Sequence, residues 1–518
     1  MAAEVKREFG RLRSFFWPVY KEEIKVFVPM LLIFFCITLN YNVLRSAKDA
    51  LVITAESSGA EALPFLKTWA ILPMAIFMTY LFTRFSNRFR TEQVFYMMMG
   101  IFLSFFLIFV FVIYPFHQDL HPHAFADRLE ESLPLGFHGL IAMFRNWTFT
   151  AFYVMAELWG TAIMTVLFWG FANQVTAVDS AKRLYALLAF VGNLSSIFAG
   201  EISTLVSGYA VTLETITQKP AWENSLVLIA SIVLISGLAA IFLFRWLHRH
   251  ALQNQSSSFS FQANPSEIKM GIRKNFAYLI KSKYLLYIAL IVIAYNLGMN
   301  LTEVVWKDQL KHLYPNPNDF QAYMGKVIMW IGFLATTMAL FCGPLIRKFN
   351  WTFAAMLPPF ILAITGLGFF SLIFLKDFGF LGTLALLGST PLSMIVLVGA
   401  AQHCLCRASK YTLFDNTKEL AFIPLNQESK LKGKAAIDGI GSRLGKSGGA
   451  LVYQFLLMLL GTISSTIPFV AIAFLVVVGT WFFAVKALGR QFHALSRQPP
   501  LAPDTEKQPQ EATYTQTT

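Results

Sequence analysis

Long apolar stretches separated by short polar segments make up most of the chain from residue 26 onwards. A helix needs about 20 mostly apolar residues to cross the hydrocarbon core of a bilayer. Twelve stretches meet this requirement, so the pattern predicts an all-α integral membrane protein with twelve transmembrane helices. They lie at about residues 26–47, 62–83, 93–114, 148–172, 184–208, 224–245, 284–305, 323–346, 352–375, 379–404, 435–460 and 464–487.

The basic residues alternate between the loops on the two sides of the predicted membrane. Segments 84–90, 245–283 and 406–434 carry clusters of Lys and Arg, whereas 115–138 holds a single Arg and 461–466 holds none. Because loops rich in Lys and Arg stay in the cytoplasm, both termini are predicted to be cytoplasmic.

The longest basic loop divides the predicted helices into two groups of six. Many transporters consist of two such repeats with the substrate bound between them near the middle of the membrane. We therefore expect a cytoplasmic N-terminal segment at 1–25, a six-helix bundle at 26–245, a basic cytoplasmic linker at 246–283, a second six-helix bundle at 284–488 and a disordered cytoplasmic tail at 489–518.

Small residues recur at the same spacing in the fifth helix of each half. Residues Gly192, Ser196 and Gly200 are four apart, and so are Gly441, Gly445 and Gly449. A face of small residues lets two helices approach closely in a membrane. The equal spacing supports a duplicated fold.

Composition agrees with the membrane interpretation. Of 518 residues, 56% are hydrophobic and 14% are charged, whereas soluble proteins carry about 25% charged residues. The net charge of +13 resides in clusters between apolar stretches, so no nucleic-acid partner is expected. The first 25 residues mix acidic and basic side chains, which argues against a cleavable signal or an organelle transit peptide.

Charged side chains inside the predicted helices are costly to insert and mark functional sites. Near the end of the first helix, Arg45, Lys48 and Asp49 share one face because they are spaced i, i+3, i+4. Glu157 lies nine residues into the fourth helix, and Glu303 lies in the outer part of the seventh. These five residues are candidates for binding a substrate.

Two further cations lie one turn apart near the middle of the eleventh helix, at Arg443 and Lys446. Lysine binds phosphate as a point charge and arginine as a two-pronged fork, so cations from both halves would form an electropositive chamber. The acids would hold these cations when the chamber is empty. The alternative is that the charges form structural ion pairs at helix ends, an interpretation that applies most to Arg45 and Asp49.

Polar and aromatic residues near these charges are further candidates. Trp147, Tyr153 and Trp159 surround the acid of the fourth helix and are able to stack on a base, although packing against lipid or neighbouring helices is the common alternative. Asn300 precedes the acid of the seventh helix by one turn. No residue pattern indicates a metal or a cofactor, and the histidines of 115–138 fit a solvated loop better than a metal site.

Five segments together resemble the ATP/ADP translocases, the nucleotide transporter family of plastids and obligate intracellular bacteria. The resemblance extends from Phe9 to about Leu488. It is carried most specifically by 40–49 (NYNVLRSAKD), 156–159 (AELW), 302–307 (TEVVWK), 409–425 (SKYTLFDNTKELAFIPL) and 432–450 (KGKAAIDGIGSRLGKSGGA).

The resemblance implies a major-facilitator-like bundle that imports ATP in exchange for ADP, with or without phosphate, by alternating access. In the family, two lysines and two glutamates are needed for transport, and they match Lys48, Glu157, Glu303 and Lys446. Arg45 and Asp49 also match. The implied partners are ATP, ADP, possible co-transported phosphate and the lipid bilayer, with no obligatory protein partner.

Two departures leave alternatives open. Ser46 and Ala47 stand where many ATP/ADP exchangers carry another pair, and Arg443 is not a family-wide feature. Proton-coupled net import of ribonucleoside triphosphates and broad-range nucleotide exchange therefore remain alternatives. The absence of a transit-peptide pattern favours a bacterial inner membrane over a plastid inner envelope. No cluster typical of a membrane-embedded enzyme and no charge ring typical of a channel is evident in the sequence.

Overall fold

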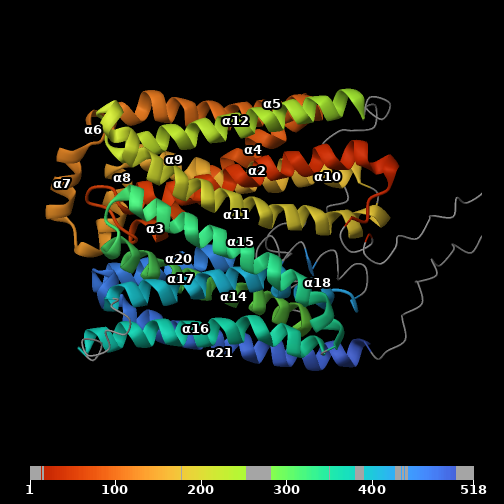
Figure 1. Ribbon diagram of the computed structural model, residues 1–518. Helices are drawn as coiled ribbons and strands as arrows, with labels where there is room; N and C mark the ends of the chain where they lie inside the picture. The colour runs from red at the N-terminus through yellow and green to blue at the C-terminus, as the bar shows by residue number, and fades with distance from the viewer. Residues whose placement is uncertain are drawn as a thin grey trace, which may run out of the picture.

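The computed structural model describes residues 13, 17–176, 178–251, 282–348, 350–379, 390–425, 433–434, 437 and 442–496. Within these ranges, the side chains of 178–179, 181–182, 342–347, 442–444, 446 and 496 lie outside the description. All regular secondary structure in the described ranges is helical (Figure 1). Eleven of the described helices are long and apolar enough to span a membrane. The all-α membrane fold is confirmed, whereas the count of twelve stays a prediction, because part of 435–460 is not described.

The N-terminal half contains six long helices, several of which include 3-10 or π-helical segments. Its elements are α2 (Lys21–Ile53), α3 (Ala62–Phe65), η1 (Leu66–Ile71), α4 (Leu72–Arg88), α5 (Thr91–Ile108), η2 (Phe109–Ile113), η3 (Tyr114–Phe116), α6 (His117–Leu120), α7 (His123–Ser132), η4 (Leu135–Phe137), α8 (His138–Arg145), α9 (Trp147–Leu158), η5 (Trp159–Phe168), α10 (Trp169–Val175), α11 (Val178–Thr217) and α12 (Ala221–His250).

The described part of the C-terminal half is built in the same way. Its elements are α14 (Lys283–Leu313), α15 (Pro317–Lys348), α16 (Trp351–Asp377), α17 (Pro391–Ser409), η9 (Lys410–Phe414), α18 (Asp415–Ala421), α20 (Ser442–Leu460) and α21 (Ile463–Ser496). The segments η1, η2, η5 and η9 are π-helical, a form that occurs frequently at functional sites.

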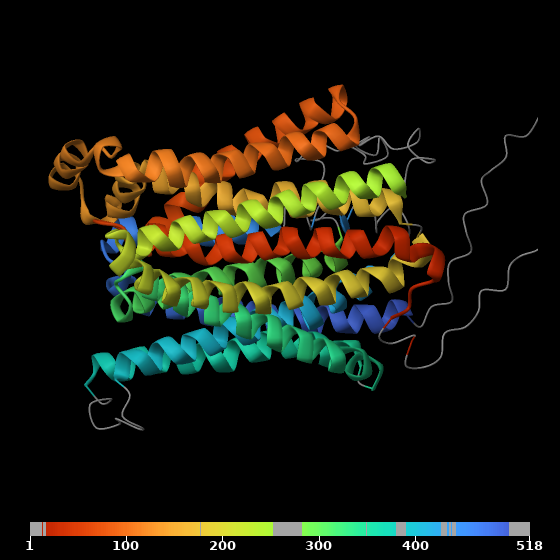
Figure 2. The same ribbon diagram turned by 45° about the horizontal axis from the view of Figure 1, so that its top comes forward.

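The helices run roughly parallel, so the bundle has two ends that can be told apart. The short helices α6, α7 and α8 lie together at one end, which we call the α7 end (Figures 1 and 2). Helix α2 begins and helix α21 finishes at the opposite end, which we call the terminal end.

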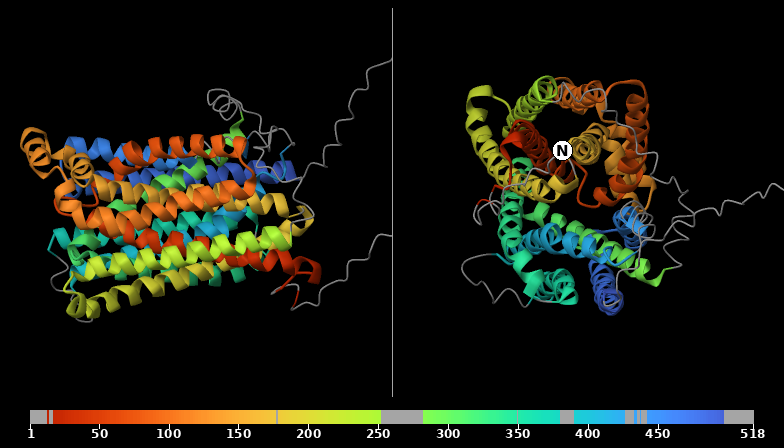
Figure 3. Two further views of the ribbon diagram at one scale, coloured as in Figure 1. Left: turned by 90° about the horizontal axis from the view of Figure 1, so that it is seen from above. Right: turned by 90° about the vertical axis from the view of Figure 1, so that its right-hand side faces the viewer.

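Equivalent helices of the two halves make equivalent contacts. Helix α2 packs against α11 and α12, and helix α14 packs against α20 and α21. Between the halves, α11 packs along α15, while α20 packs against α3 and η1. The fifth helix of each half thus contacts the second helix of the other, as two related repeats would. Viewed along the helices, the two halves lie side by side (Figure 3, right).

Glycines allow the closest of these contacts. A Cβ on Gly200 of α11 would lie 2.4 Å from the carbonyl oxygen of Gly325 on α15, so the two backbones touch. A Cβ on Gly445 or Gly449 of α20 would lie 2.7 or 3.1 Å from asparagine side chains of α14. The predicted small-residue faces are confirmed at these positions, and Gly441 lies outside the described residues.

The tenth predicted helix is displaced along the chain. We expected it at 379–404, but the helix begins at Pro391 and continues through η9 and α18 to Ala421. Thr390 caps it by accepting a hydrogen bond from the backbone N–H of Ser393, and Pro391 occupies the first helical position, where proline is favoured. Much of the basic segment expected as the loop 406–434 is therefore helical, while residues 380–389 lie outside the description.

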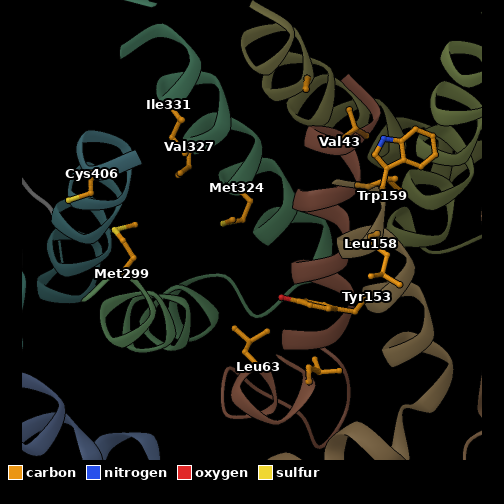
Figure 4. Packing of buried hydrophobic residues seen from close by; sticks show 14 of the residues in the cluster. Val43, Leu63, Tyr153, Leu158, Trp159, Met299, Met324, Val327, Ile331 and Cys406 are labelled. Carbon is orange, nitrogen blue, oxygen red and sulfur yellow. The ribbon is translucent and has the colours of Figure 1, made fainter. Parts of the chain in front are cut away.

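Apolar side chains fill each half and leave polar atoms facing the boundary between them. In Figure 4, Leu158 and Trp159 lie within the N-terminal half, while Met299 and Met324 lie on helices of the C-terminal half. The hydroxyl of Tyr153 points away from Leu158 and Trp159 toward this boundary.

Candidate functional site

Three buried charges lie on one face of α2. Arg45, Lys48 and Asp49 are 8%, 4% and 1% exposed. We expected them near the end of the first helix, but α2 continues to Ile53, so they lie inside the helix. Burial of so many charges is costly unless each is paired or holds a ligand, and their partners define the site.

Lys48 forms the closest pair with the acid of the fourth helix. Its Nζ lies 2.6 Å from Glu157 Oε2 and 3.8 Å from the centre of the Tyr153 ring, so the ammonium group contacts a carboxylate and an aromatic face. The Glu157 side chain is 38% exposed, whereas the Lys48 side chain is 6% exposed. The pair therefore has one solvent-accessible side.

Lys307 of α14 connects the two halves. Its Nζ lies 2.8 Å from Asp49 Oδ2 on α2 and 2.8 Å from Glu303 Oε1, one turn earlier on its own helix. Lys48 Nζ is 4.0 Å from the other oxygen of Asp49. The side chains of Lys307 and Asp49 are 3% and 2% exposed, so this pair is shielded from water.

Lys67 makes a second connection between the halves. It lies in the π-helical segment η1 of the second helix. Its Nζ donates to Asn300 Oδ1 at 2.6 Å and lies 3.5 Å from Glu303 Oε2. The extra residue per turn in a π-helix changes which side chains face inward, and η1 directs this lysine toward α14.

Glu303 is surrounded by cations. In addition to Lys67 and Lys307, the guanidinium of Arg407 on α17 lies 3.6 Å from Glu303 Oε1. Three cations share a carboxylate that can balance only one of them. The surplus positive charge is available to another anion.

The described charges around Asp49, Glu157 and Glu303 do not balance. Cations outnumber carboxylates by five to three, which gives a formal excess of two positive charges between the halves. We call these eight side chains the central cluster: Arg45, Lys48, Lys67, Lys307 and Arg407, with Asp49, Glu157 and Glu303. Lysine and arginine in a water-poor site bind phosphate oxygens strongly, so the cluster suits a ligand with several negative charges.

The other sequence candidates fall into two groups. The side chains of Arg443 and Lys446 lie outside the description, although both residues belong to α20, which packs against α14. The structure does not bring Trp147 or Trp159 to the central cluster. The indole N–H of Trp147 donates to the carbonyl of Leu120 at 2.8 Å, and that of Trp159 to an α2 carbonyl at 2.9 Å.

Three members of the central cluster were not among the predicted site residues. Lys67 lies within the predicted span 62–83, where the cost of a buried charge could have singled it out. Lys307 is spaced i, i+4 from Glu303, which is an ion-pair signal on a helix. Arg407 was assigned to the loop 406–434 because the apolar run ended before it, and the structure corrects this by placing it in α17.

Polar contacts between the halves, where both partners are described, extend from Arg45 toward the α7 end. Gln454 of α20 accepts from the indole of Trp69 at 3.2 Å and donates to the carbonyl of Pro64 at 2.8 Å. Lys311 of α14 donates to the carbonyl of Ser58. These contacts close the α7 end over the central cluster.

A separate ion-pair network lies at the α7 end, outside the candidate spans. His138 Nδ1 is 3.1 Å from Glu61 Oε1, and its Nε2 is 3.6 Å from Glu130, which also pairs with Arg145 at 3.1 Å. The hydrogen bond to Glu61 raises the pKa of His138 despite its burial. Burial alone would raise the pKa of Glu61, but the same hydrogen bond outweighs it and lowers that pKa. The network fixes α8 and α7 to the start of α3.

Known structures and sequences similar to the chain agree on a transporter fold. A D-xylose–proton symporter superposes with a TM-score of 0.54 at 12% identity, covering 90% of this chain and 97% of that one. A bacterial homologue of the iron transporter ferroportin in an inward-facing state gives 0.53 at 14%, covering 92% and 99%. At such low identity the likeness shows the fold alone.

Sequence relatives are much more similar. ADP,ATP carrier protein 1 of Chlamydia trachomatis is 42% identical over 499 residues, covering 96% of this chain and 94% of that protein. ADP,ATP carrier protein 1, chloroplastic, of Arabidopsis thaliana is 41% identical over 487 residues, covering 93% and 76%. The model of the TLC ATP/ADP transporter family matches residues 2–492. The chain therefore belongs to the TLC ATP/ADP transporter family.

Proposed function

We propose that the chain imports ATP in exchange for ADP by alternating access, with the central cluster as the site that holds the phosphate chain. The observation that carries this proposal is the excess of two positive charges among the described side chains of the central cluster. Relatives named ADP,ATP carrier proteins, 42% and 41% identical, support ATP and ADP as substrates. The chain acts as a carrier and catalyses no chemical step.

Binding follows from exchange of partners within the central cluster. A hydrogen bond to a charged group contributes about 1.5–3 kcal/mol, so two or three such bonds from lysine and arginine account for binding of a nucleotide di- or triphosphate. Lys48 would leave Glu157 for a phosphate, and Lys446 would approach from α20. Glu157 and Glu303 would then take the cations back when the nucleotide leaves.

Exchange without net transport follows from the contacts of the empty carrier. Asp49–Lys307 and Glu303–Lys67 join the halves and keep the α7 end closed. Opening that end without a ligand would separate buried opposite charges, which is expensive. A bound nucleotide would supply replacement anions for the cations, so the loaded carrier would reorient faster than the empty one.

The orientation in the membrane follows from the basic loops. Placing the terminal end in the cytoplasm puts the basic segment 84–90 inside, as the positive-inside rule requires. The α7 end, where Gln454 and Lys311 join the two halves, then faces outward. The bacterial relatives support the inner membrane of a bacterium as the location.

The test is uptake of labelled ATP into proteoliposomes that contain ADP, ATP or buffer alone. Uptake only into nucleotide-loaded vesicles is the expected result. Equal uptake into empty vesicles, driven by an inward proton gradient, would instead indicate proton-coupled net import of ribonucleoside triphosphates. Competition by GTP, CTP and UTP measures whether exchange has a broad range. Absence of uptake of any nucleotide would contradict the proposal.

A further inference from the structure

A buried histidine lies between two arginines, one from each half. The Nε2 atom of His403 on α17 accepts a hydrogen bond from Arg407 Nε at 2.8 Å, and the guanidinium of Arg45 on α2 lies 3.5 Å from the same atom. His403 is 4% exposed. One ring nitrogen therefore brings together two guanidinium groups that belong to different repeats.

The imidazole is held in a fixed plane and one tautomer. Its ring stacks on Trp306 with centroids 5.0 Å apart and an angle of 23°. The indole is itself fixed, because Trp306 donates to the carbonyl of Val396 at 3.1 Å. Since Nε2 accepts from Arg407, the proton of neutral His403 lies on Nδ1. The residue thus orients the arginines without adding a negative charge.

Arg45 has no acidic partner among the residues that the structure describes. It is 8% exposed, and among the described residues no carboxylate lies within ion-pair distance of it, so the contact with His403 Nε2 is its one described polar contact. Of the described carboxylates, Arg407 has only that of Glu303, which it shares with two lysines, at 3.6 Å. A buried guanidinium with so few acceptors is unfavourable unless an anion completes its hydrogen bonds.

We propose that His403 is a positioning residue that holds Arg45 and Arg407 side by side as a clamp on the phosphate chain of the nucleotide. The proposal rests on the proposed function, because the anion is taken to be the transported nucleotide. Each guanidinium can form two parallel bonds to phosphate oxygens. Because the arginines belong to opposite repeats, a phosphate chain between them bridges the two halves.

The uncharged acceptor is the essential feature of this arrangement. A carboxylate in place of the imidazole would hold the arginines equally well, but it would neutralise them and compete with phosphate. An apolar side chain would leave both charges unpositioned. Replacements of His403 can therefore separate the orientation of the arginines from their availability for an anion.

The experiment measures binding of ATP, AMP and inorganic tripolyphosphate to the purified full-length chain by titration calorimetry, with a thermal unfolding curve for each variant. His403→Gln keeps a neutral acceptor, His403→Glu supplies a carboxylate, and His403→Leu removes the acceptor. His138→Leu is the matched control, because it removes a paired histidine from the network at the α7 end.

We expect His403→Glu and His403→Leu to weaken ATP and tripolyphosphate binding by about tenfold or more, and to reduce the preference for ATP over AMP. His403→Gln and His138→Leu should stay within about threefold of the unmodified chain. The unfolding temperature of His403→Glu should also be no lower than that of the unmodified chain, because its carboxylate pairs with both arginines. A merely structural histidine would show loss of affinity only together with loss of stability.

The outcomes separate the two proposals. If His403→Glu folds and binds ATP and tripolyphosphate as tightly as the unmodified chain, the clamp is wrong even if His403→Leu fails to fold. If the unmodified chain binds tripolyphosphate with the expected variant pattern but does not bind ATP, the two arginines clamp a polyphosphate, but the nucleotide as its occupant and the proposed function both fail. If the chain binds neither anion, both proposals are overturned.

Discussion

Replacing Lys307 by methionine should leave the most deeply buried carboxylate of the central cluster without its closest cation. Asp49 would lose its cation at 2.8 Å and, of the described cations, keep only Lys48 at 4.0 Å. Glu303, the other partner of Lys307, would retain two cations. The cost of the change therefore falls on Asp49.

The size of the effect follows from burial. The side chains of Asp49 and Lys307 are 2% and 3% exposed, and removal of one partner from a buried ion pair costs about 3–5 kcal/mol. Asp49→Asn should cost less, because Lys307 still has Glu303 at 2.8 Å. The double variant Asp49→Asn/Lys307→Met removes both charges, so it should be more stable than Lys307→Met alone.

Two assays measure the effect of losing this ion pair, one on stability and one on opening of the α7 end. Thermal unfolding of the purified protein reports loss of stability. The rate at which a maleimide labels Ser58→Cys, in a chain with its other cysteines replaced, reports opening of the α7 end, because Ser58 is 4% exposed there. A lower unfolding temperature, faster labelling or both are expected for Lys307→Met. Lys219→Met is the control and should have little effect, because Lys219 is 54% exposed and its ion-pair partner Glu223 lies four residues further along the chain.

Two results would contradict the role of the Asp49–Lys307 pair. If Lys307→Met unfolds and reacts like the unmodified protein, the Asp49–Lys307 pair does not hold the halves together. If the double variant is less stable than both single variants, the two charges do not interact as partners.

Three further predictions concern other parts of the fold. Lys67→Met should raise the ATP concentration for half-maximal exchange by about tenfold, and unchanged kinetics would exclude Lys67 from the site. Gly200→Val should lower both unfolding temperature and exchange, because its side chain would push against the Gly325 carbonyl, whereas Gly208→Val, with open space around it, should not. The stability advantage of the unmodified chain over His138→Ala should decrease as the pH rises from about 5 to about 8, through the raised pKa of His138. An advantage that grows with pH in unfolding curves would contradict the Glu61–His138 pair.

The membrane fold and part of the site follow from sequence because insertion energy is a local property. Apolar length indicates the spans, and a charge within a span stands out by its cost. Lys48, Glu157 and Glu303 were identified in this way, and all three lie in the central cluster. Their partners are not local: the pairing of Asp49 with Lys307 depends on how α2 and α14 cross.

Helix ends and helix type explain why the sequence pattern does not predict Arg407 and Lys67 as site residues. The apolar run 379–404 ended before Arg407, whereas the cap at Thr390 and paired side chains such as Lys410–Asp415, at 3.2 Å, allow the helix to continue past it. Lys67 faces α14 through a π-helical segment, which hydropathy does not reveal. An orientation that depends on one extra residue in a turn needs the packed structure.

The most direct test of the central cluster is exchange of labelled ATP for internal ADP by Lys48→Gln beside Lys21→Gln. Both changes remove one lysine charge from α2, but Lys48 is buried against Glu157 and Lys21 is exposed at the start of the helix. We expect Lys48→Gln to reduce the exchange rate by about tenfold to a hundredfold and Lys21→Gln to leave it nearly unchanged. Equal rates for the two variants, at equal amounts of protein in the vesicles, would contradict a transport site built on the central cluster.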